Sequence, residues 1–310
     1  MEELVREKFP IQPNFAFAYG SGVFDQIETK ENKSMSQKDR PMVDYIFAVD
    51  DPVAWHKANL ETNGDHYSAI QYAGADFIAN IQENFGASIY FNTLVDVPEY
   101  NQKIKYGVIS TSSLCRDLET WDTLYVSGRL HKPVRVIISP DTGKSEEATR
   151  LNTGLHNNLT RALNASLFLL PETFTKFELF ETIVGLSYTG DMRVGIAENP
   201  RKVQNIVRGS FDNLESLYKE VNPQLLNASD TDTGKLHQDM SETARLQLLQ
   251  SLPERFHQHD PGTLDREVLI RQLRQTIARS SKSQTIKGFL TAGWKKSAVY
   301  ALQKLRKALR

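Results

Sequence analysis

The chain has 310 residues, of which 40% are hydrophobic and 24% charged, and this composition excludes a mainly disordered protein. The length predicts about two domains. The single cysteine, Cys115, excludes an internal disulfide and a cysteine-based zinc site, and it fits a reducing compartment. No stretch approaches the roughly 20 apolar residues of a membrane span. The N-terminal MEELVREKF lacks the Arg-rich, acid-poor pattern of a transit peptide.

Charge is distributed unevenly, although the net charge is only -1. Residues 268–310 contain eleven Lys and Arg but no Asp or Glu, whereas the preceding part has 26 basic and 38 acidic residues. A basic end of this kind favours an anionic partner, either nucleic acid or an acidic membrane surface.

The first part of the chain predicts strands alternating with helices. A helix is expected from Pro52 with Asp51 as its N-cap, and another between Ser68 and Gly86. The polar segment 140–150 is the best boundary candidate. We therefore expect a mixed α/β domain over residues 1–145. Its strands are predicted from β-branched and aromatic content at 14–19, 43–49, 88–94, 104–110 and 132–139.

After residue 146 apolar residues recur at helical spacing, which predicts a smaller, mostly helical second domain over 146–285. The polar, Asp-rich stretch 227–240 is predicted to be a mobile loop. Residues 286–310 predict a basic amphipathic helix, typical of an interfacial anchor on an anionic membrane. The alternative is a helix that packs its apolar stripe on the protein core. The apolar arc contains Leu290, Trp294, Ala298, Ala301, Leu302, Leu305 and Leu309.

A Gly-Ser-Gly turn directly follows the first predicted strand. Gly20 and Gly22 would let backbone N–H groups approach an oligophosphate closely, and the Ser21 hydroxyl adds a further donor. A plain corner between a strand and a helix is the alternative interpretation.

Asp44 lies within the otherwise apolar strand predicted at 43–49. Burying a lone carboxylate costs several kcal/mol unless a cation or hydrogen-bond donors compensate, and a metal ion would do so. Because side chains alternate along a strand, Asp44 and Asp50 share one face, so both are candidate metal ligands. Helix capping is the alternative for Asp50 and the favoured role for Asp51.

The serine turn followed by a carboxylate on the next strand resembles the nucleotidyltransferase superfamily. In that superfamily the turn holds a triphosphate and strand carboxylates hold magnesium. Members of that superfamily carry two acids separated by one residue. In this chain the residues two positions before and two positions after Asp44 are Met42 and Ile46, and neither is an acid. The second metal ligand therefore comes from elsewhere, or the metal site is leaner than usual.

Longer motifs between about residues 14 and 220 are more specific: YGSGVFDQ, MVDYIFAVDDPVAWHKANLETNGDHYS, YGVIS, LYVSGRLHKPV, LSYTGDMR and ENPRKVQNIV. Together they resemble the mitochondrial CDP-diacylglycerol synthase family, first known as a translocator assembly and maintenance protein. The resemblance implies Mg²⁺-dependent transfer of CMP from CTP to phosphatidic acid, giving CDP-diacylglycerol and pyrophosphate for cardiolipin synthesis. It also implies a peripheral protein at the matrix side of the mitochondrial inner membrane. The implied fold is a nucleotidyltransferase domain followed by a winged-helix-like domain.

The implied reaction mainly requires positive charge, because its nucleophile is an already ionised lipid phosphate that must approach a triphosphate. The resemblance makes Arg193 and Lys202 candidates for catalysis together with Asp44 and Ser21. His131 is a further candidate cation. The residues expected to bind CTP are Tyr19, Gly20, Ser21, Gly22, Arg129 and Lys132.

Each cation also has a structural interpretation. Arg129 and Lys132 flank a turn where exposed cations are common, and Arg193 could pair locally with Asp191. Lys202 starts a helix, where a cation opposes the helix dipole, so function is favoured there.

Four other polar residues are predicted to be structural. His56 and His66 are expected to form hydrogen bonds rather than bind ligands, and Asp117 and Asp122 are expected to lie on a solvated helix face.

Two other functions remain open at this point. A nucleotidyltransferase acting on RNA or another soluble acceptor would use aromatic residues interleaved with cations. The tail separates them, so no nucleic acid partner is expected. A non-catalytic import or assembly factor is supported by the absence of an acid at Met42 or Ile46.

Overall fold

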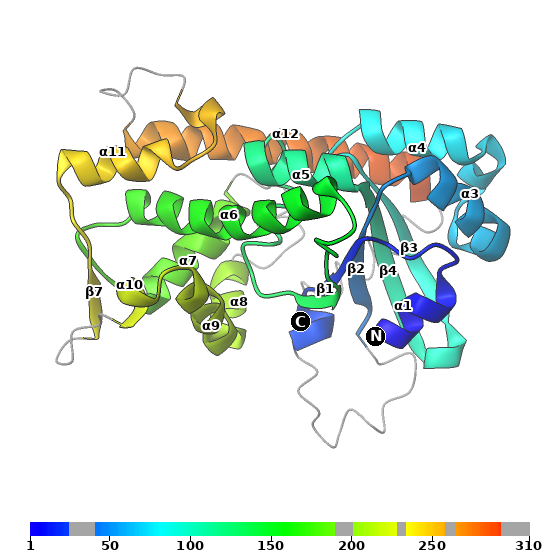
Figure 1. The fold of residues 1–310 in the computed structure, drawn as a ribbon, viewed down its shortest axis with the longest axis horizontal. Helices are drawn as coiled ribbons and strands as arrows, with labels where there is room; N and C mark the ends of the chain where they lie inside the picture. The colour runs from blue at the N-terminus through cyan, green and yellow to red at the C-terminus, as the bar shows by residue number, and fades with distance from the viewer. Residues whose placement is uncertain (25–40, 190–200, 228–233, 258–264, 293–310) are drawn as a thin grey trace. The chain divides into compact units, whose positions relative to one another are not determined.

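The computed structural model describes residues 1–24, 41–189, 201–227, 234–257 and 265–292 (Figure 1). The chain divides into two units. The first comprises residues 1–115, 134–152 and 282–310, and the second comprises residues 116–133 and 153–281. Three helices contribute residues to both units: α5 (Thr111–Thr120), α6 (Glu146–Leu169) and α12 (Arg266–Ala292).

The first unit contains a five-stranded mixed sheet in the order β3-β4-β2-β1-β5. β2 and β4 are parallel, and the other neighbouring pairs are antiparallel. The predicted strands and the mixed α/β class are confirmed. The strands are β1 (Phe15–Tyr19), β2 (Val43–Val49), β3 (Ile89–Val97), β4 (Gln102–Ser110) and β5 (Arg135–Ile138).

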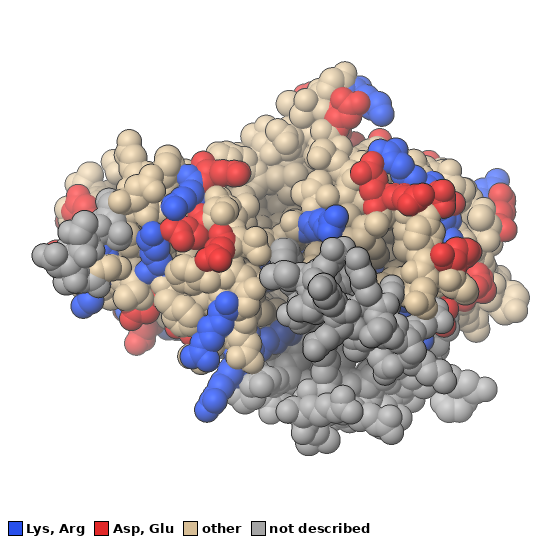
Figure 2. Space-filling view, turned by 90° about the horizontal axis from the view of Figure 1, so that it is seen from below, with Lys and Arg blue, Asp and Glu red and all other residues tan. Residues whose placement is uncertain are grey.

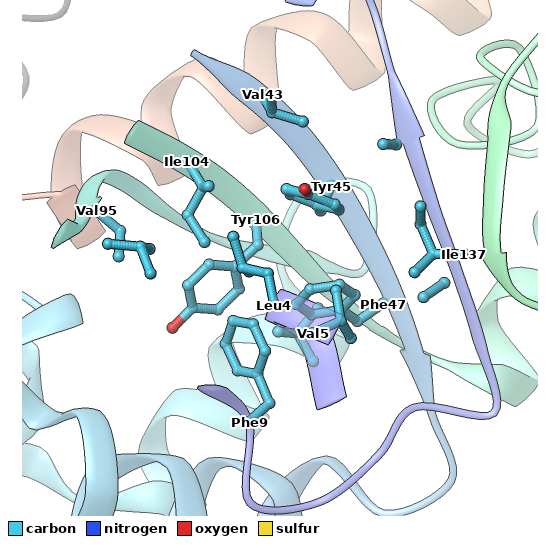
Figure 3. Packing of buried hydrophobic residues seen from close by; sticks show 14 of the residues in the cluster. Leu4, Val5, Phe9, Val43, Tyr45, Phe47, Val95, Ile104, Tyr106 and Ile137 are labelled. Carbon is cyan, nitrogen blue, oxygen red and sulfur yellow. The ribbon is translucent and has the colours of Figure 1, made fainter. Parts of the chain in front are cut away.

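One face of this sheet is covered by α1 (Glu2–Lys8). Leu4 and Val5 of this helix, with Phe9 just after it, pack on apolar side chains that alternate along β2, as Figure 3 shows. Those side chains are Val43, Tyr45 and Phe47. Because side chains alternate along a strand, the Asp44 side chain projects from the opposite face of the sheet.

The helices of the first unit follow the predicted caps with one difference. Asp51 caps α3 (Pro52–Asn63) and accepts hydrogen bonds from the amides of Val53 and Ala54 at 2.9 and 3.0 Å. The helix expected between Ser68 and Gly86 is interrupted, because Gly74 has a φ of +83° that no helix continues. The remaining elements are α2 (Ser21–Phe24), η2 (Gly64–His66), η3 (Ala69–Ala73), α4 (Ala75–Asn84) and η4 (Pro98–Tyr100).

The second unit is mostly helical and also contains a two-stranded antiparallel sheet. Part of the stretch 227–240, predicted to be a loop, is strand β7 (Lys235–His237), which pairs with β6 (Thr173–Thr175) because Leu236 is buried beside Phe174. Residues 228–233 of that stretch lie outside the described residues. The helices are α7 (Lys176–Leu186), α8 (Lys202–Gly209), α9 (Phe211–Val221), α10 (Pro223–Asn227) and α11 (Glu242–Gln250), with η5 (Glu254–Phe256).

The two units do not coincide with the contiguous domains predicted over 1–145 and 146–285, because each unit is built from separate stretches of the chain. Residues 116–133 belong to the second unit, and the chain returns to the first unit from residue 282. Within the described ranges, none of the helices combines the length and the apolar character needed to cross a membrane.

Candidate active site

The glycine turn and Asp44 lie together in the first unit. Tyr19, the last residue of β1, pairs with Asp44 of β2, so the turn that follows β1 begins beside this carboxylate. A Cβ built on Gly20 would lie 3.7 Å from Asp44 Oδ2, and Gly20 has a φ of +83°. Glycine at this position therefore permits both the backbone conformation and the open space next to the carboxylate.

Gly22 is required for a different reason. A Cβ at this position would overlap the backbone carbonyl oxygen of Met42, so the turn packs directly on the chain entering β2. Ser21 begins α2, and the Val23 amide donates to the Gly20 carbonyl at 3.1 Å. The backbone of the turn is thus held against the start of β2.

The charge environment of Asp44 includes a lysine that the sequence analysis missed. Lys105 of β4 is the register partner of Asp44, and its Nζ lies 3.4 Å from Asp44 Oδ1. Lys105 Nζ also lies 4.5 Å from the centre of the Phe91 ring. A lysine in the apolar strand predicted at 104–110 was the signal that could have identified it.

Asp44 meets the requirements for a lean magnesium site. Its Oδ1 is buried and accepts no hydrogen bond from the described residues, but it is ion-paired with Lys105, so a metal ion would have to share or replace this lysine contact. Mg²⁺ is commonly held by one or two carboxylates and completed by substrate phosphates and water. Among the described residues no cluster of three or more His, Cys, Asp or Glu forms a metal site. One carboxylate beside the glycine turn is compatible with such an ion if the substrate supplies further oxygens.

Asp50 does not join Asp44. The two residues are six positions apart on one extended strand, which corresponds to roughly 20 Å at about 3.3 Å per residue. Asp50 accepts hydrogen bonds from Asn14 Nδ2 and, at 3.0 Å, from Thr111 Oγ1. Asp44 is the second residue of β2 and Asp50 follows its last residue, so the length of the strand separates the two acids.

The second unit brings together three of the predicted cations. Arg129 donates from Nη1 to the Tyr125 carbonyl, and its guanidinium carbon lies 4.0 Å from the centre of the Tyr125 ring. Lys132 donates from Nζ to the Gly128 carbonyl and, at 2.7 Å, to Ser187 Oγ. The interpretation of Lys132 as an ordinary exposed cation is therefore wrong.

Lys132 and Lys202 share one aromatic ring. Their Nζ atoms lie 5.2 and 4.9 Å from the centre of the Tyr188 ring. Burial lowers the pKa of Lys132 well below its usual range, and the positive charges of Arg129 and Lys202 lower it further. A bound anion would relieve this repulsion, so this cation cluster (Arg129, Lys132 and Lys202) is suited to phosphate.

Charge on the visible surface is mixed. Basic and acidic side chains both occur over the described residues on the face that Figure 2 shows.

His131 is not one of these cations. Its side chain is fully buried, and its Nε2 donates to Asn158 Oδ1 at 3.1 Å. Burial lowers its pKa to about 3, with Lys132 adding to the effect, so the ring is neutral at neutral pH. The prediction of a cationic His131 is therefore wrong.

The two histidines predicted to be structural, His56 and His66, have that role. His56 Nε2 donates to Gln82 Oε1 at 2.9 Å, and its Nδ1 accepts from the Tyr67 hydroxyl at 2.8 Å. His66 Nδ1 pairs with the Tyr106 hydroxyl at 2.9 Å. Both rings are buried.

The prediction for Asp117 is wrong, whereas Asp122 is exposed as expected. Asp117 retains only 5% of its exposure because its carboxylate turns toward the backbone that follows α5. Polar sequence around it gave no sign of this burial.

Two parts of the predicted site cannot be placed. Arg193 and Asp191 lie outside the described residues, as does the tail from residue 293. Within the start of the predicted tail, Ile286 is 46% exposed, whereas Lys287 is buried and donates to the carbonyls of Gln82 and Phe85 at 3.0 and 2.7 Å. The tail therefore does not begin at residue 286 as a free basic helix.

Comparison with known proteins matches almost the whole chain. The profile of the family described as "Phosphatidate cytidylyltransferase, mitochondrial" matches residues 1–267 and 258–307. Proteins with that same name are 40% identical in Xenopus laevis (97% of this chain and 92% of the relative) and 38% identical in Danio rerio (98% and 93%). The Schizosaccharomyces pombe relative is 36% identical over 95% of this chain and 80% of its own length. The chain belongs to the mitochondrial phosphatidate cytidylyltransferase family.

Proposed function

We propose that this protein transfers CMP from CTP to phosphatidic acid, producing CDP-diacylglycerol and pyrophosphate. The placement of the Gly20 turn beside Asp44 is the observation that carries the proposal, because it puts backbone amides suited to phosphate next to a carboxylate suited to a metal ion. The names of the related proteins supply the substrate class.

The reaction forms one bond and breaks another at the α-phosphorus of CTP. A phosphate oxygen of phosphatidic acid bonds to this phosphorus, while the bond to the β-phosphate oxygen breaks and pyrophosphate leaves. The nucleophile is already an anion, so no side chain must remove a proton. The chain must instead bind and orient two anions that repel each other.

In the first unit the turn residues Gly20, Ser21 and Gly22 would hold the phosphates of CTP, with Tyr19 at the entrance to the turn. Asp44 would hold Mg²⁺, which would neutralise phosphate charge when bound. Lys105 lies close enough to Asp44 to compensate the carboxylate before the substrate arrives.

In the second unit the cation cluster would bind phosphate charge. Arg129 and Lys132 are proposed to bind CTP, and Lys202 is proposed to stabilise charge that develops on the departing pyrophosphate. The crowding of Lys132 by two other cations supports this role, since an anion relieves it. Arg193 is proposed as a further catalytic cation.

We further propose peripheral binding to the matrix side of the mitochondrial inner membrane, in support of cardiolipin synthesis. The relatives are named mitochondrial, and the phosphatidic acid substrate is a membrane lipid. The basic segment 293–310 is the proposed contact with anionic lipid, because its cations have no acidic residue nearby in sequence.

The catalytic proposal is tested by pyrophosphate release from CTP in the presence of Mg²⁺ and vesicles containing phosphatidic acid. We expect Asp44→Asn to lower the rate by about a hundredfold or more, since electrostatic stabilisation of this kind is a large catalytic contribution. Asp50→Asn is the matched control, because this acid follows the far end of the same strand, and it should retain activity. Absence of release with the unaltered protein, or full activity in Asp44→Asn, would refute the proposal.

The membrane proposal needs a separate experiment, flotation with vesicles that contain anionic phospholipid. Deletion should begin at residue 293, so that Lys287 keeps its contacts. Loss of flotation with an unchanged melting temperature is expected. Equal flotation of the full and shortened chains would show that the tail is not the anchor.

A further inference from the structure

One buried carboxylate in the second unit receives an unusual number of hydrogen bonds. Asp117 Oδ1 accepts from the amides of Thr123 and Leu124 at 3.0 and 3.1 Å and from Thr123 Oγ1 at 2.6 Å. Asp117 Oδ2 accepts from the amides of Val126 and Ser127 at 3.1 and 2.9 Å. Both oxygens of a nearly buried side chain are thus satisfied by residues 123–127.

The backbone held by Asp117 adopts unfavourable conformations. Trp121 and Leu124 have φ values of +54° and +50°, a region that costs a residue other than glycine about 1–2 kcal/mol. Such conformations persist where surrounding contacts determine them. The amide of Leu124 is itself one of the donors to Asp117, so the carboxylate stabilises the strained backbone directly.

The same segment is fixed at a second point by Asn158 of α6. Asn158 Oδ1 accepts from Trp121 Nε1 at 2.8 Å, and Asn158 Nδ2 donates to the Ser127 carbonyl at 3.0 Å. Gly128 follows Ser127 in the chain, and a Cβ on it would overlap the Leu124 carbonyl oxygen and the Ser187 side chain. Residues 121–132 therefore form a closely packed loop with little freedom to move.

Two members of the cation cluster extend directly from this loop. The Arg129 and Leu130 amides both donate to the Val126 carbonyl, and the Lys132 amide donates to the Arg129 carbonyl. Val126 is in turn held by Asp117. A continuous chain of hydrogen bonds thus links Asp117 to the backbone of both Arg129 and Lys132.

We propose that Asp117 is a positioning residue for the cytidylyltransferase reaction. Through residues 123–127 it fixes Arg129 and Lys132 in the arrangement that receives substrate phosphate, without contacting the substrate itself. The inference rests on the proposed role of these cations in binding CTP. It adds a residue on α5 to the functional set.

The first test compares Asp117→Asn with Asp122→Asn in the intact protein. The asparagine amide cannot accept from the two backbone donors that it would face, so the loop must shift. We expect the KM for CTP to rise roughly ten- to a hundredfold, since small displacements of binding groups have effects of this size. Asp122 is a nearby exposed acid, and its variant should keep the KM of the unaltered protein.

The KM separates positioning from simple loss of folded protein. A variant that only unfolds in part lowers the apparent kcat in proportion to the missing protein, and the remaining molecules keep their KM. Thr123→Val removes one side-chain donor to Asp117 and the acceptor of the Tyr125 amide but keeps the four backbone donors to Asp117, so it serves as a milder variant if Asp117→Asn does not fold. It should raise the KM for CTP by a smaller factor.

A double variant distinguishes this inference from the proposed function. Asp117→Asn and Lys132→Met should have less than multiplicative effects on kcat/KM, because both act through the same cation. If Lys132→Met alone leaves kcat/KM unchanged, the proposed CTP role of Lys132 fails. If Lys132→Met is impaired but Asp117→Asn keeps its KM, or the two effects multiply fully, the positioning role of Asp117 is refuted and the proposed function stands.

Discussion

Asp44 lies beside Gly20, with 3.7 Å between Oδ2 and the position that a Cβ on Gly20 would take. The pairing of Tyr19 with Asp44 places the end of β1 beside the start of β2. Gly20 also leaves the space beside the carboxylate open for a ligand.

Adding a methyl group to Gly20 should therefore separate function from stability. Gly20 and Gly74 both have a φ of +83°, so alanine at either position should strain the backbone by about 1–3 kcal/mol. Nothing lies within 4 Å of a Cβ at Gly74. We expect both variants to lose stability in urea denaturation, whereas only Gly20→Ala should lose most of its pyrophosphate release. Equal activity of the two variants would contradict the assignment of the turn.

Loss of charge in the cation cluster should weaken CTP binding. Lys132→Met keeps an apolar side chain of similar length but removes the donor to Ser187 Oγ and the positive charge beside Tyr188. The KM for CTP should rise about tenfold, within the range of a lost charge-assisted hydrogen bond. Lys144→Met is the control, since the Lys144 side chain is 81% exposed. An unchanged KM in Lys132→Met would exclude Lys132 from the site.

Two buried histidines should make the protein sensitive to acid. Burial lowers the pKa of His56 to about 4 and that of His131 to about 3, compared with about 6.5 in the unfolded chain. Between these values the unfolded state binds more protons, so stability should fall as the pH falls from about 6.5 toward 4. Urea denaturation of His56→Gln should show a shallower dependence on pH, while the exposed His237→Gln should follow the unaltered protein. The same slope in all three would contradict this account.

Lys287 should make the stability of the protein depend on pH above pH 7. Its burial against the end of α4 lowers its pKa to about 7, with Glu83 opposing the shift, whereas the unfolded value is about 10.4. The unfolded state therefore binds more protons between these values, and stability gained from neutral Lys287 should increase as the pH rises above 7. The stability difference between the unaltered protein and Lys287→Met should grow from pH 7 to pH 9. A constant difference would show that Lys287 does not titrate there.

Local sequence patterns predicted the strands and the α/β class well. The β-branched segment 43–49 is β2 to the residue, and Asp51 with Pro52 marks the start of α3. These features depend on neighbouring residues, so they can be read from short segments. The turn at Gly20 and the lone acid at Asp44 were recognised in the same way.

The remaining parts of the site depend on contacts distant in sequence. Lys105 reaches Asp44 only because β4 pairs with β2 in parallel, and Tyr188 approaches Lys132 and Lys202 only after the helices of the second unit pack. Asp117 has an ordinary polar neighbourhood in sequence, but its partners follow a change in chain direction after α5. Asp50 shows the converse, because alternation along a strand does not bring together two acids that are separated by the length of β2.

The alternation of the chain between its two units limits how this protein can be divided. The chain passes from one unit to the other after residues 115, 133, 152 and 281. A cut near residue 145 would leave each fragment with pieces of both units, and the fragment 1–145 would lack the Lys287 and Gln284 contacts that complete the turn after α4. The two units are consequently not exchangeable modules, and recombination between relatives should preserve function only when all these segments are inherited together.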